Sequence, residues 1–163
     1  MRAVKNKVFI DTNVLIYAYD LSAGDKHAIA KEVVLDIWNE RRGVLSTQVL
    51  QEFAVAVTSK IARPIDFETV KIIISDFLLW DMVINNGHSI LEAVEIQSKH
   101  RLSFWDALIV QAARKGGAGV LLTEDLSDGR VIEGVRIKNP FKIDKTSYSV
   151  RYAHRCPCSY RSI

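Results

Sequence analysis

The hydrophobic and polar positions of this chain fall into two alternating kinds of pattern. Short runs of bulky apolar residues, each followed by turn-forming polar residues, are typical of buried parallel strands. Longer stretches in which apolar residues recur three or four positions apart are typical of helices that bury one face. The sequence predicts strands at 8–10, 44–46, 82–85, 120–123 and 135–137, and helices at 14–19, 25–42, 47–60, 67–79, 89–100 and 104–115.

The order of these elements predicts the fold class. Strands that alternate with helices form βαβ units, in which a parallel sheet carries helices on both faces. We therefore expect an α/β protein with three layers, αβα, and we place 135–137 at an edge of its sheet. Asn13 suits the N-cap of the first helix, and Gly43 suits the C′ position that ends the second helix.

Length and composition fit one globular domain. The 163 residues are enough to bury a core, and 48% hydrophobic and 25% charged residues are ordinary values. Because the apolar periodicity ends near Phe141, we interpret 1–144 as the domain and 145–163 as a tail that need not be native sequence. The tail holds four of the 22 basic residues and no acid, which leaves 18 basic against 19 acidic residues in 1–144. The net charge of +3 is therefore no argument that the domain binds nucleic acid.

Both cysteines, Cys156 and Cys158, lie in the tail near His154. These three residues alone are a weak case for a metal site, and the chain has no disulfide framework. No apolar run approaches the roughly 18 residues of a membrane span. The N-terminal residues lead directly into the first predicted strand. We therefore expect a cytoplasmic protein that does not enter a membrane.

Asp11 directly follows the first predicted strand and so stands at its carboxyl end. Ligands of open α/β sheets bind in the crevice outside these strand ends. Two interpretations of Asp11 stay open: a turn acid stabilised by the neighbouring helix amides, or a functional carboxylate. Asp125 follows another predicted strand and reaches the same edge, where Glu124 and Asp128 compete with it for this role.

Two further acids stand on predicted helices without a basic neighbour. A basic residue three or four positions from an acid forms a surface ion pair on a helix. Around Glu52 these positions hold Gln48, Val49, Val55 and Ala56. We therefore expect that nothing local pairs with Glu52. Asp106 also lacks a basic neighbour, but Ser103 can cap its helix and make Asp106 a favourable acid of the first turn.

These four acids suggest a cluster of carboxylates in one cleft. Packed together without cations, they would repel and would raise one another's pKa. Mg²⁺ and Mn²⁺ are hard divalent cations that prefer oxygen ligands, and they would relieve this repulsion. A carboxylate-bound pair of ions about 4 Å apart suits phosphodiester hydrolysis, because it activates water and stabilises the leaving oxygen.

Five motifs follow one another along the chain around these acids. They are Phe9-Ile10-Asp11-Thr12-Asn13, Gln51-Glu52-Phe53, Trp105-Asp106-Ala107, Leu122-Thr123-Glu124-Asp125-Leu126 and the closing Gly134-Val135-Arg136-Ile137-Lys138-Asn139-Pro140-Phe141. In this order they resemble PIN-domain ribonucleases, and specifically the VapC-type toxins of prokaryotic toxin–antitoxin pairs. The resemblance covers about residues 7–141. It implies a PIN-like fold with a mostly parallel sheet of about five strands, Mg²⁺- or Mn²⁺-dependent RNA cleavage, a homodimer and inhibition by a cognate antitoxin protein.

The resemblance also assigns roles to residues. The catalytic and metal-binding side chains would be Asp11, Glu52, Asp106 and Asp125. Glu52 would hold or orient the attacking water, and Asn13 and Thr123 would support the site. Candidate phosphate contacts are Arg63, Lys99, His100, Arg101, Arg114 and Lys115. The alternative is a catalytically silent PIN-like module that binds RNA or a protein partner, and the four unpaired acids argue against it.

Overall fold

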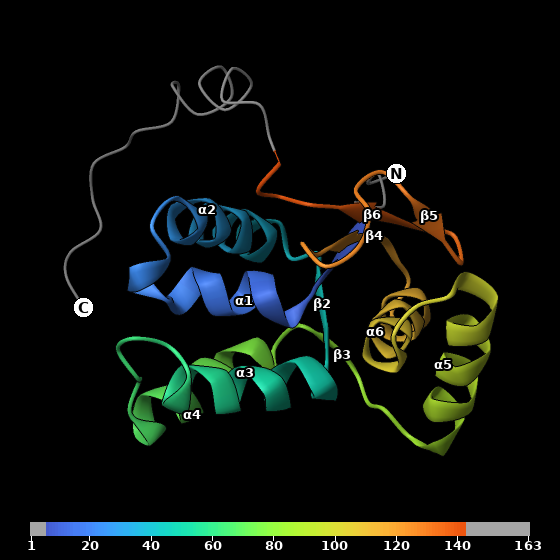
Figure 1. Ribbon diagram of the computed structural model, residues 1–163. Helices are drawn as coiled ribbons and strands as arrows, with labels where there is room; N and C mark the ends of the chain where they lie inside the picture. Colours follow the sequence, from blue (N-terminus) through green and yellow to red (C-terminus); the bar gives the residue numbers. More distant parts are fainter. Residues whose placement is uncertain (1–5, 143–163) are drawn as a thin grey trace.

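The computed structural model describes residues 6–142. Its strands are β1 (Lys7–Ile10), β2 (Gly43–Ser46), β3 (Asp81–Val83), β4 (Ala118–Leu122), β5 (Val131–Ile132) and β6 (Val135–Lys138). In this part of the chain they form one six-stranded sheet in the order β3-β2-β1-β4-β6-β5 (Figure 1). Every pairing is parallel except that of β5 with β6. The mostly parallel sheet is therefore confirmed.

The C-terminal edge of the sheet differs from the prediction. The strand expected at the edge, β6, lies between β4 and β5, and the two-residue β5 takes the edge position. A two-residue turn joins β5 to β6, with φ of 51° at Glu133 and 82° at Gly134. Two positive φ values suit the twist of an antiparallel hairpin. The sheet thus gains a sixth strand that is too short to produce an apolar pattern in the sequence.

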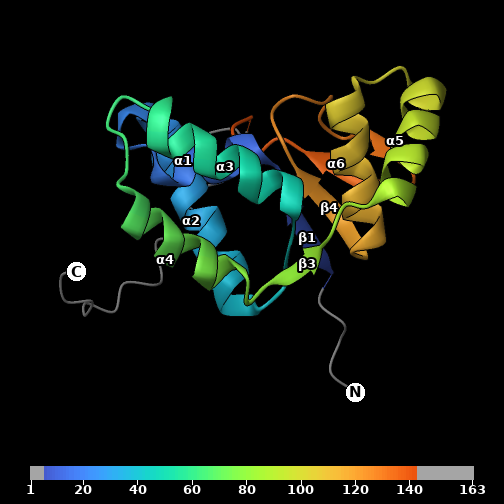
Figure 2. The same ribbon diagram turned by 90° about the horizontal axis from the view of Figure 1, so that it is seen from below.

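Helices cover both faces of the sheet, as expected. They are α1 (Thr12–Tyr19), α2 (Asp25–Glu40), α3 (Thr47–Ser59), α4 (Phe67–Phe77), α5 (Gly87–His100) and α6 (Phe104–Lys115), with a short 3₁₀ turn, η1, at Leu21–Ala23. Figures 1 and 2 show α1 to α4 on one side of the strands and α5 and α6 on the other. The three-layer αβα architecture is therefore confirmed.

Two predicted helix ends lie elsewhere. Asp11 is the N-cap of α1, and its carboxylate accepts a hydrogen bond from the backbone N–H of Thr12, so Asn13 stands inside the helix. The second helix ends at Glu40, and its C-cap residue Arg41 has a left-handed φ of 52°. Gly43 instead begins β2, where a Cβ atom would lie 2.1 Å from the Trp80 ring. The absence of a side chain at this position therefore lets Trp80 pack on the sheet.

The central strand β1 fixes the position of the site. Phe9 and Ile10 are fully buried between the two helical layers, and β1 pairs with β2 on one side and β4 on the other. The carboxyl end of β1 therefore opens beside that of β4. No helix in residues 6–142 is long and apolar enough to cross a membrane. The predicted tail, 145–163, and its cysteines lie outside the described residues.

Candidate active site

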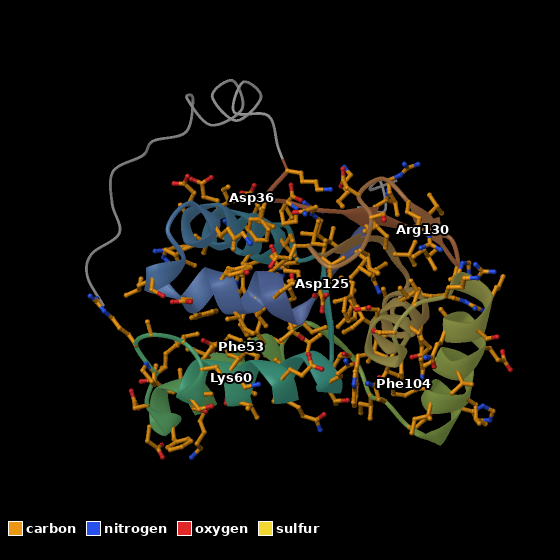
Figure 3. The ribbon with its side chains drawn as sticks, viewed as in Figure 1. Asp36, Phe53, Lys60, Phe104, Asp125 and Arg130 are labelled. Atoms are coloured by element: carbon orange, nitrogen blue, oxygen red, sulfur yellow. The ribbon has the colours of Figure 1, made fainter. Side chains whose placement is uncertain are left out.

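A groove of about 620 Å³ opens at the carboxyl ends of β1 and β4. The N-terminal halves of α1 and α6 border it, because both helices begin at this edge of the sheet, and α3 borders it along its length from Gln48 to the C-cap residue Lys60. Figure 3 shows Asp125 near the centre of the molecule beside α1. All four acids predicted from the sequence line this groove: Asp11, Glu52, Asp106 and Asp125. The fold thus brings together side chains from four separate segments.

Asp11 is the most buried of the four, with 7% of its surface exposed. Its carboxylate accepts hydrogen bonds from the Thr123 hydroxyl at 2.7 Å and the Thr12 backbone N–H at 2.7 Å. Burial nevertheless raises the pKa of Asp11 from its ordinary 3.8 to about 7. The two hydrogen bonds oppose this rise, and the charges of Asp125 and Glu52 add to it. The charged form of Asp11 therefore lacks full compensation within the groove.

Asp125 faces Asp11 across a shared amide. The Asn13 side chain donates to Asp125 Oδ2 at 2.7 Å and to Asp11 Oδ2 at 3.2 Å. The Thr123 hydroxyl accepts from the Asp125 backbone N–H at 3.1 Å. The loop is anchored further by the Thr123 backbone N–H, which donates to Lys138 O at 3.0 Å. Asn13 and Thr123 thus support the two acids at the ends of β1 and β4.

The other two acids of this turn point elsewhere. Asp128 Oδ1 accepts a hydrogen bond from the Asn139 backbone N–H at 2.8 Å and lines a different groove. Glu124 accepts 2.6 Å hydrogen bonds from Lys26 and Tyr17. These two hydrogen bonds lower the pKa of Glu124 although burial opposes them. Of the three competing acids, Asp125 is the one that lines the carboxylate groove.

Glu52 reaches the groove from α3 and has two hydrogen-bond partners. Thr12 Oγ1 donates to Glu52 Oε2 at 2.7 Å, and Gln48 Nε2 donates to Glu52 Oε1 at 3.0 Å. The expectation that nothing local pairs with Glu52 was therefore wrong. That expectation considered only basic partners, whereas an uncharged amide one helical turn away also bonds a carboxylate. Glutamine four positions before an acid was the signal available in the sequence.

Asp106 stands in the first turn of α6, as expected. Its backbone N–H donates to Ser103 Oγ at 3.1 Å, and the Ser103 hydroxyl donates to Asp106 Oδ2 at 2.6 Å. Ser103 is the N-cap of the helix, so the predicted cap is confirmed. The N-terminal helix dipole favours a negative charge at this position. The neighbouring Trp105 is 61% exposed and lines the same groove.

The residues predicted to contact phosphate do not line the groove. Lys99, His100 and Arg114 instead bond Glu133 at 2.7, 2.7 and 3.3 Å. Arg63, Arg101 and Lys115 are also outside its lining. Among the described residues, the one basic side chain in the lining is Lys60, which follows the last residue of α3. Sequence reasoning missed Lys60, which lies two helical turns beyond Glu52.

The chemistry of the groove fits a hard divalent cation. Its charged ligand candidates are four carboxylates, and oxygen is the donor that Mg²⁺ and Mn²⁺ prefer. The Asn13 and Gln48 amide oxygens are buried without a hydrogen-bond partner among the described residues. Within residues 6–142, however, no group of three or more histidines, cysteines or acids is spaced to hold a metal ion. The donor set therefore fits the cation in kind, and Mg²⁺ needs only one or two direct carboxylate ligands because it keeps several of its waters.

The mostly parallel sheet and the four acids beside its strand ends define the general class, an α/β protein with a carboxylate site. The chain belongs to the PIN domain family, whose family model matches residues 8–127. A search of curated proteins found no match.

Solved structures share the fold at low sequence identity. A toxin–antitoxin complex from Klebsiella pneumoniae aligns over 84% of this chain and all of its own, with a TM-score of 0.61 and 20% identity. DNA-bound VapBC from Salmonella typhimurium covers 83% of this chain and 99% of its own, with a TM-score of 0.58 and 18% identity. VapC20 of Mycobacterium tuberculosis, a toxin that cleaves the sarcin–ricin loop, covers 71% and 87%, with a TM-score of 0.54 and 17% identity. These likenesses confirm the PIN-like fold.

Proposed function

We propose that this protein is a metal-dependent endoribonuclease and the toxin of a VapBC-type toxin–antitoxin pair. The observation that carries the proposal is the gathering of Asp11, Glu52, Asp106 and Asp125 in one groove. Membership of the PIN domain family supports it. The structural neighbours agree with it, since they include toxin–antitoxin complexes and a toxin that cleaves the sarcin–ricin loop.

In this proposal the four acids have two different roles. Asp11, Asp106 and Asp125 hold Mg²⁺ or Mn²⁺, which when bound activates a water and offsets negative charge on the phosphate oxygens. Glu52 accepts a hydrogen bond from the attacking water and orients it in line with the phosphorus–oxygen bond that breaks. Asn13 and Thr123 keep Asp11 and Asp125 in place through the hydrogen bonds described above. This chemistry does not use the 2′-hydroxyl, so the preference for RNA rests on the family.

We further propose that a cognate antitoxin protein inhibits the enzyme by covering the groove, and that the toxin is a cytoplasmic homodimer. The antitoxin is supported by the neighbouring structures, of which the Klebsiella pneumoniae complex and the Salmonella typhimurium VapBC contain one. An exposed Trp105 and Val55 at the groove provide apolar surface that a partner can bury.

Cleavage of RNA by the full chain tests the function. We expect cleavage that requires Mg²⁺ or Mn²⁺ and stops on addition of EDTA. Asp11→Asn is expected to lower the rate about 100-fold or more, because the cation loses the charge of its most buried ligand. Gel analysis of labelled RNA, both single-stranded and structured, measures these rates.

Asp128→Asn is the matched control for this experiment. It makes the same chemical change at a neighbouring acid, but Asp128 lies outside the groove and bonds the Asn139 backbone N–H through an oxygen that asparagine also has. We expect this variant to cleave RNA at the wild-type rate. Binding of RNA without metal-dependent cleavage would instead favour the catalytically silent module.

A further inference from the structure

Gln48 is a buried polar residue on the wall of the carboxylate groove. It is the second residue of α3, only 5% of its surface is exposed, and it lies one helical turn before Glu52. Its Nε2 donates to Glu52 Oε1 at 3.0 Å, while Thr12 Oγ1 donates to Glu52 Oε2 at 2.7 Å. Each oxygen of the Glu52 carboxylate is therefore held by an uncharged donor, one from α3 and one from α1.

This arrangement leaves the other end of the Gln48 amide without a partner. A carboxylate that carries its charge can only accept hydrogen bonds, so the amide nitrogen must face Glu52. The Gln48 carbonyl oxygen is consequently buried, and no described residue donates to it. A buried acceptor without a donor destabilises a folded protein. The fold thus loses stability at Gln48 while the Glu52 carboxylate gains a fixed orientation.

We propose that Gln48 is a positioning residue that orients Glu52 toward the reacting water, at the expense of folding stability. The inference rests on the proposed nuclease function and extends it to a residue that acts through Glu52. Glu52 is exposed, and without Gln48 its long side chain is free to rotate about the single hydrogen bond from Thr12. Loss of the fixed geometry slows the chemical step more than it weakens substrate binding.

Gln111 provides an internal control with the same chemistry away from the groove. It is 2% exposed on α6, its Nε2 donates to Glu92 Oε2 at 2.7 Å, and its carbonyl oxygen is also buried without a partner among the described residues. Neither Gln111 nor Glu92 lines the carboxylate groove. Replacing each glutamine by methionine, which is close to it in volume and has no amide, therefore makes the same change at two places.

The experiment compares Gln48→Met, Gln111→Met and the wild type as full chains. We expect both variants to keep or raise the melting temperature, by up to about 2–4 °C, because each loses an unpaired buried acceptor. Gln48→Met is expected to lower kcat about 10- to 100-fold with KM nearly unchanged, because the interaction acts in the chemical step. Gln111→Met is expected to keep the wild-type kcat and KM.

Two results would overturn the positioning role. Wild-type kcat in Gln48→Met contradicts it directly. A fall in kcat that accompanies a fall in melting temperature, or that Gln111→Met shares, shows a merely structural effect.

If the wild type shows no metal-dependent cleavage, the proposed function fails, and crystal structures of the three proteins then test the positioning role by itself. A Glu52 side chain that takes several rotamers in Gln48→Met, but one in Gln111→Met and the wild type, supports that role. The same single Glu52 rotamer in all three proteins rejects it.

Discussion

Asp11 has three structural features that act on one carboxylate. It directly follows the central strand, caps α1 through its bond to the Thr12 backbone N–H, and lies buried beside Asp125 and Glu52. The cap and the Thr123 hydroxyl favour its charged form, whereas burial and the neighbouring acids favour the neutral form. Burial dominates, since the pKa of Asp11 rises to about 7. A bound cation would therefore favour the charged form that the groove alone disfavours.

The raised pKa predicts how the metal-free protein responds to pH. With a folded-state pKa of about 7 against an ordinary 3.8, folding retains a proton that the unfolded chain releases. The stability associated with this proton is fully present below pH 3.8 and is lost as pH rises to about 7. Asp11→Asn avoids the loss, so in EDTA at pH 8 it should melt about 5 °C or more above the wild type. The difference should shrink toward pH 5.

Calorimetry or circular dichroism from pH 5 to pH 8 measures this difference, with Asp128→Asn as the control. A difference between Asp11→Asn and the wild type that is constant over this range would contradict the raised pKa.

At this scale the sequence predicted the acids better than their partners. Asp11 and Asp125 follow apolar strands and Asp106 follows a capping serine, which are local signals. The choice between Asp125 and Asp128 was not predictable, because it depends on bonds to Asn13 and Asn139 that form only in the folded chain. The hydrogen bond from Gln48 to Glu52 was missed because only basic residues were considered as partners of an acid.

Among the elements, the β5–β6 hairpin bonds two helices of one layer through a single acid in its turn. Glu133 stands in the turn and bonds Lys99 and His100 of α5 and Arg114 of α6. Hydrogen bonds from Lys99 and His100 lower the pKa of Glu133 to about 2 although burial opposes them. The edge of the sheet is thereby fastened to both helices of one layer.

Glu133→Gln is expected to weaken this attachment. It should lower the free energy of unfolding by about 1–3 kcal/mol near pH 7, because the bonds from Lys99, His100 and Arg114 lose the charge of their acceptor. Since the folded-state pKa lies below the ordinary 4.5, the contribution is present above pH 4.5 and disappears as pH falls toward 2. Urea unfolding at pH 7 and pH 4 should show a smaller difference between variant and wild type at pH 4. Glu68→Gln, on the exposed face of α4, is the control.

The predictability of the elements follows their length and burial. The strands β1 to β4 and all six described helices were located because each has a run or period of apolar residues. The two-residue β5 has no such pattern, and its turn uses Glu133 at a positive φ, which is uncommon for glutamate. Because β5 was not predicted, β6 was expected at the edge of the sheet although it lies one strand inside it.

For the whole molecule, the domain boundary at Asp144 is still a prediction. The apolar pattern ends near Phe141, and the Phe141 ring packs edge-to-face on Tyr17 at 5.3 Å. A chain that ends after Asp144 retains every residue of the groove. We expect its melting temperature to lie within about 2 °C of the full chain, because the apolar pattern that predicts a core ends before the removed residues begin. Its rate of metal-dependent cleavage should also be unchanged.

Thermal melts and the same RNA assay compare the two chains side by side. A large fall in melting temperature would show that the domain extends beyond Asp144.

The topology of the sheet also determines how late in synthesis the groove can form. Asp11 leaves the ribosome early, Asp125 comes 114 residues later, and the Lys138 carbonyl that anchors the Thr123 backbone belongs to β6, later still. A nascent chain that stops before β6 therefore lacks the strand that anchors the Thr123 backbone at the groove. A fragment that ends between Asp125 and β6 carries all four acids without this anchor. The proposed hydrolytic activity would therefore arise only after nearly the whole domain has been translated.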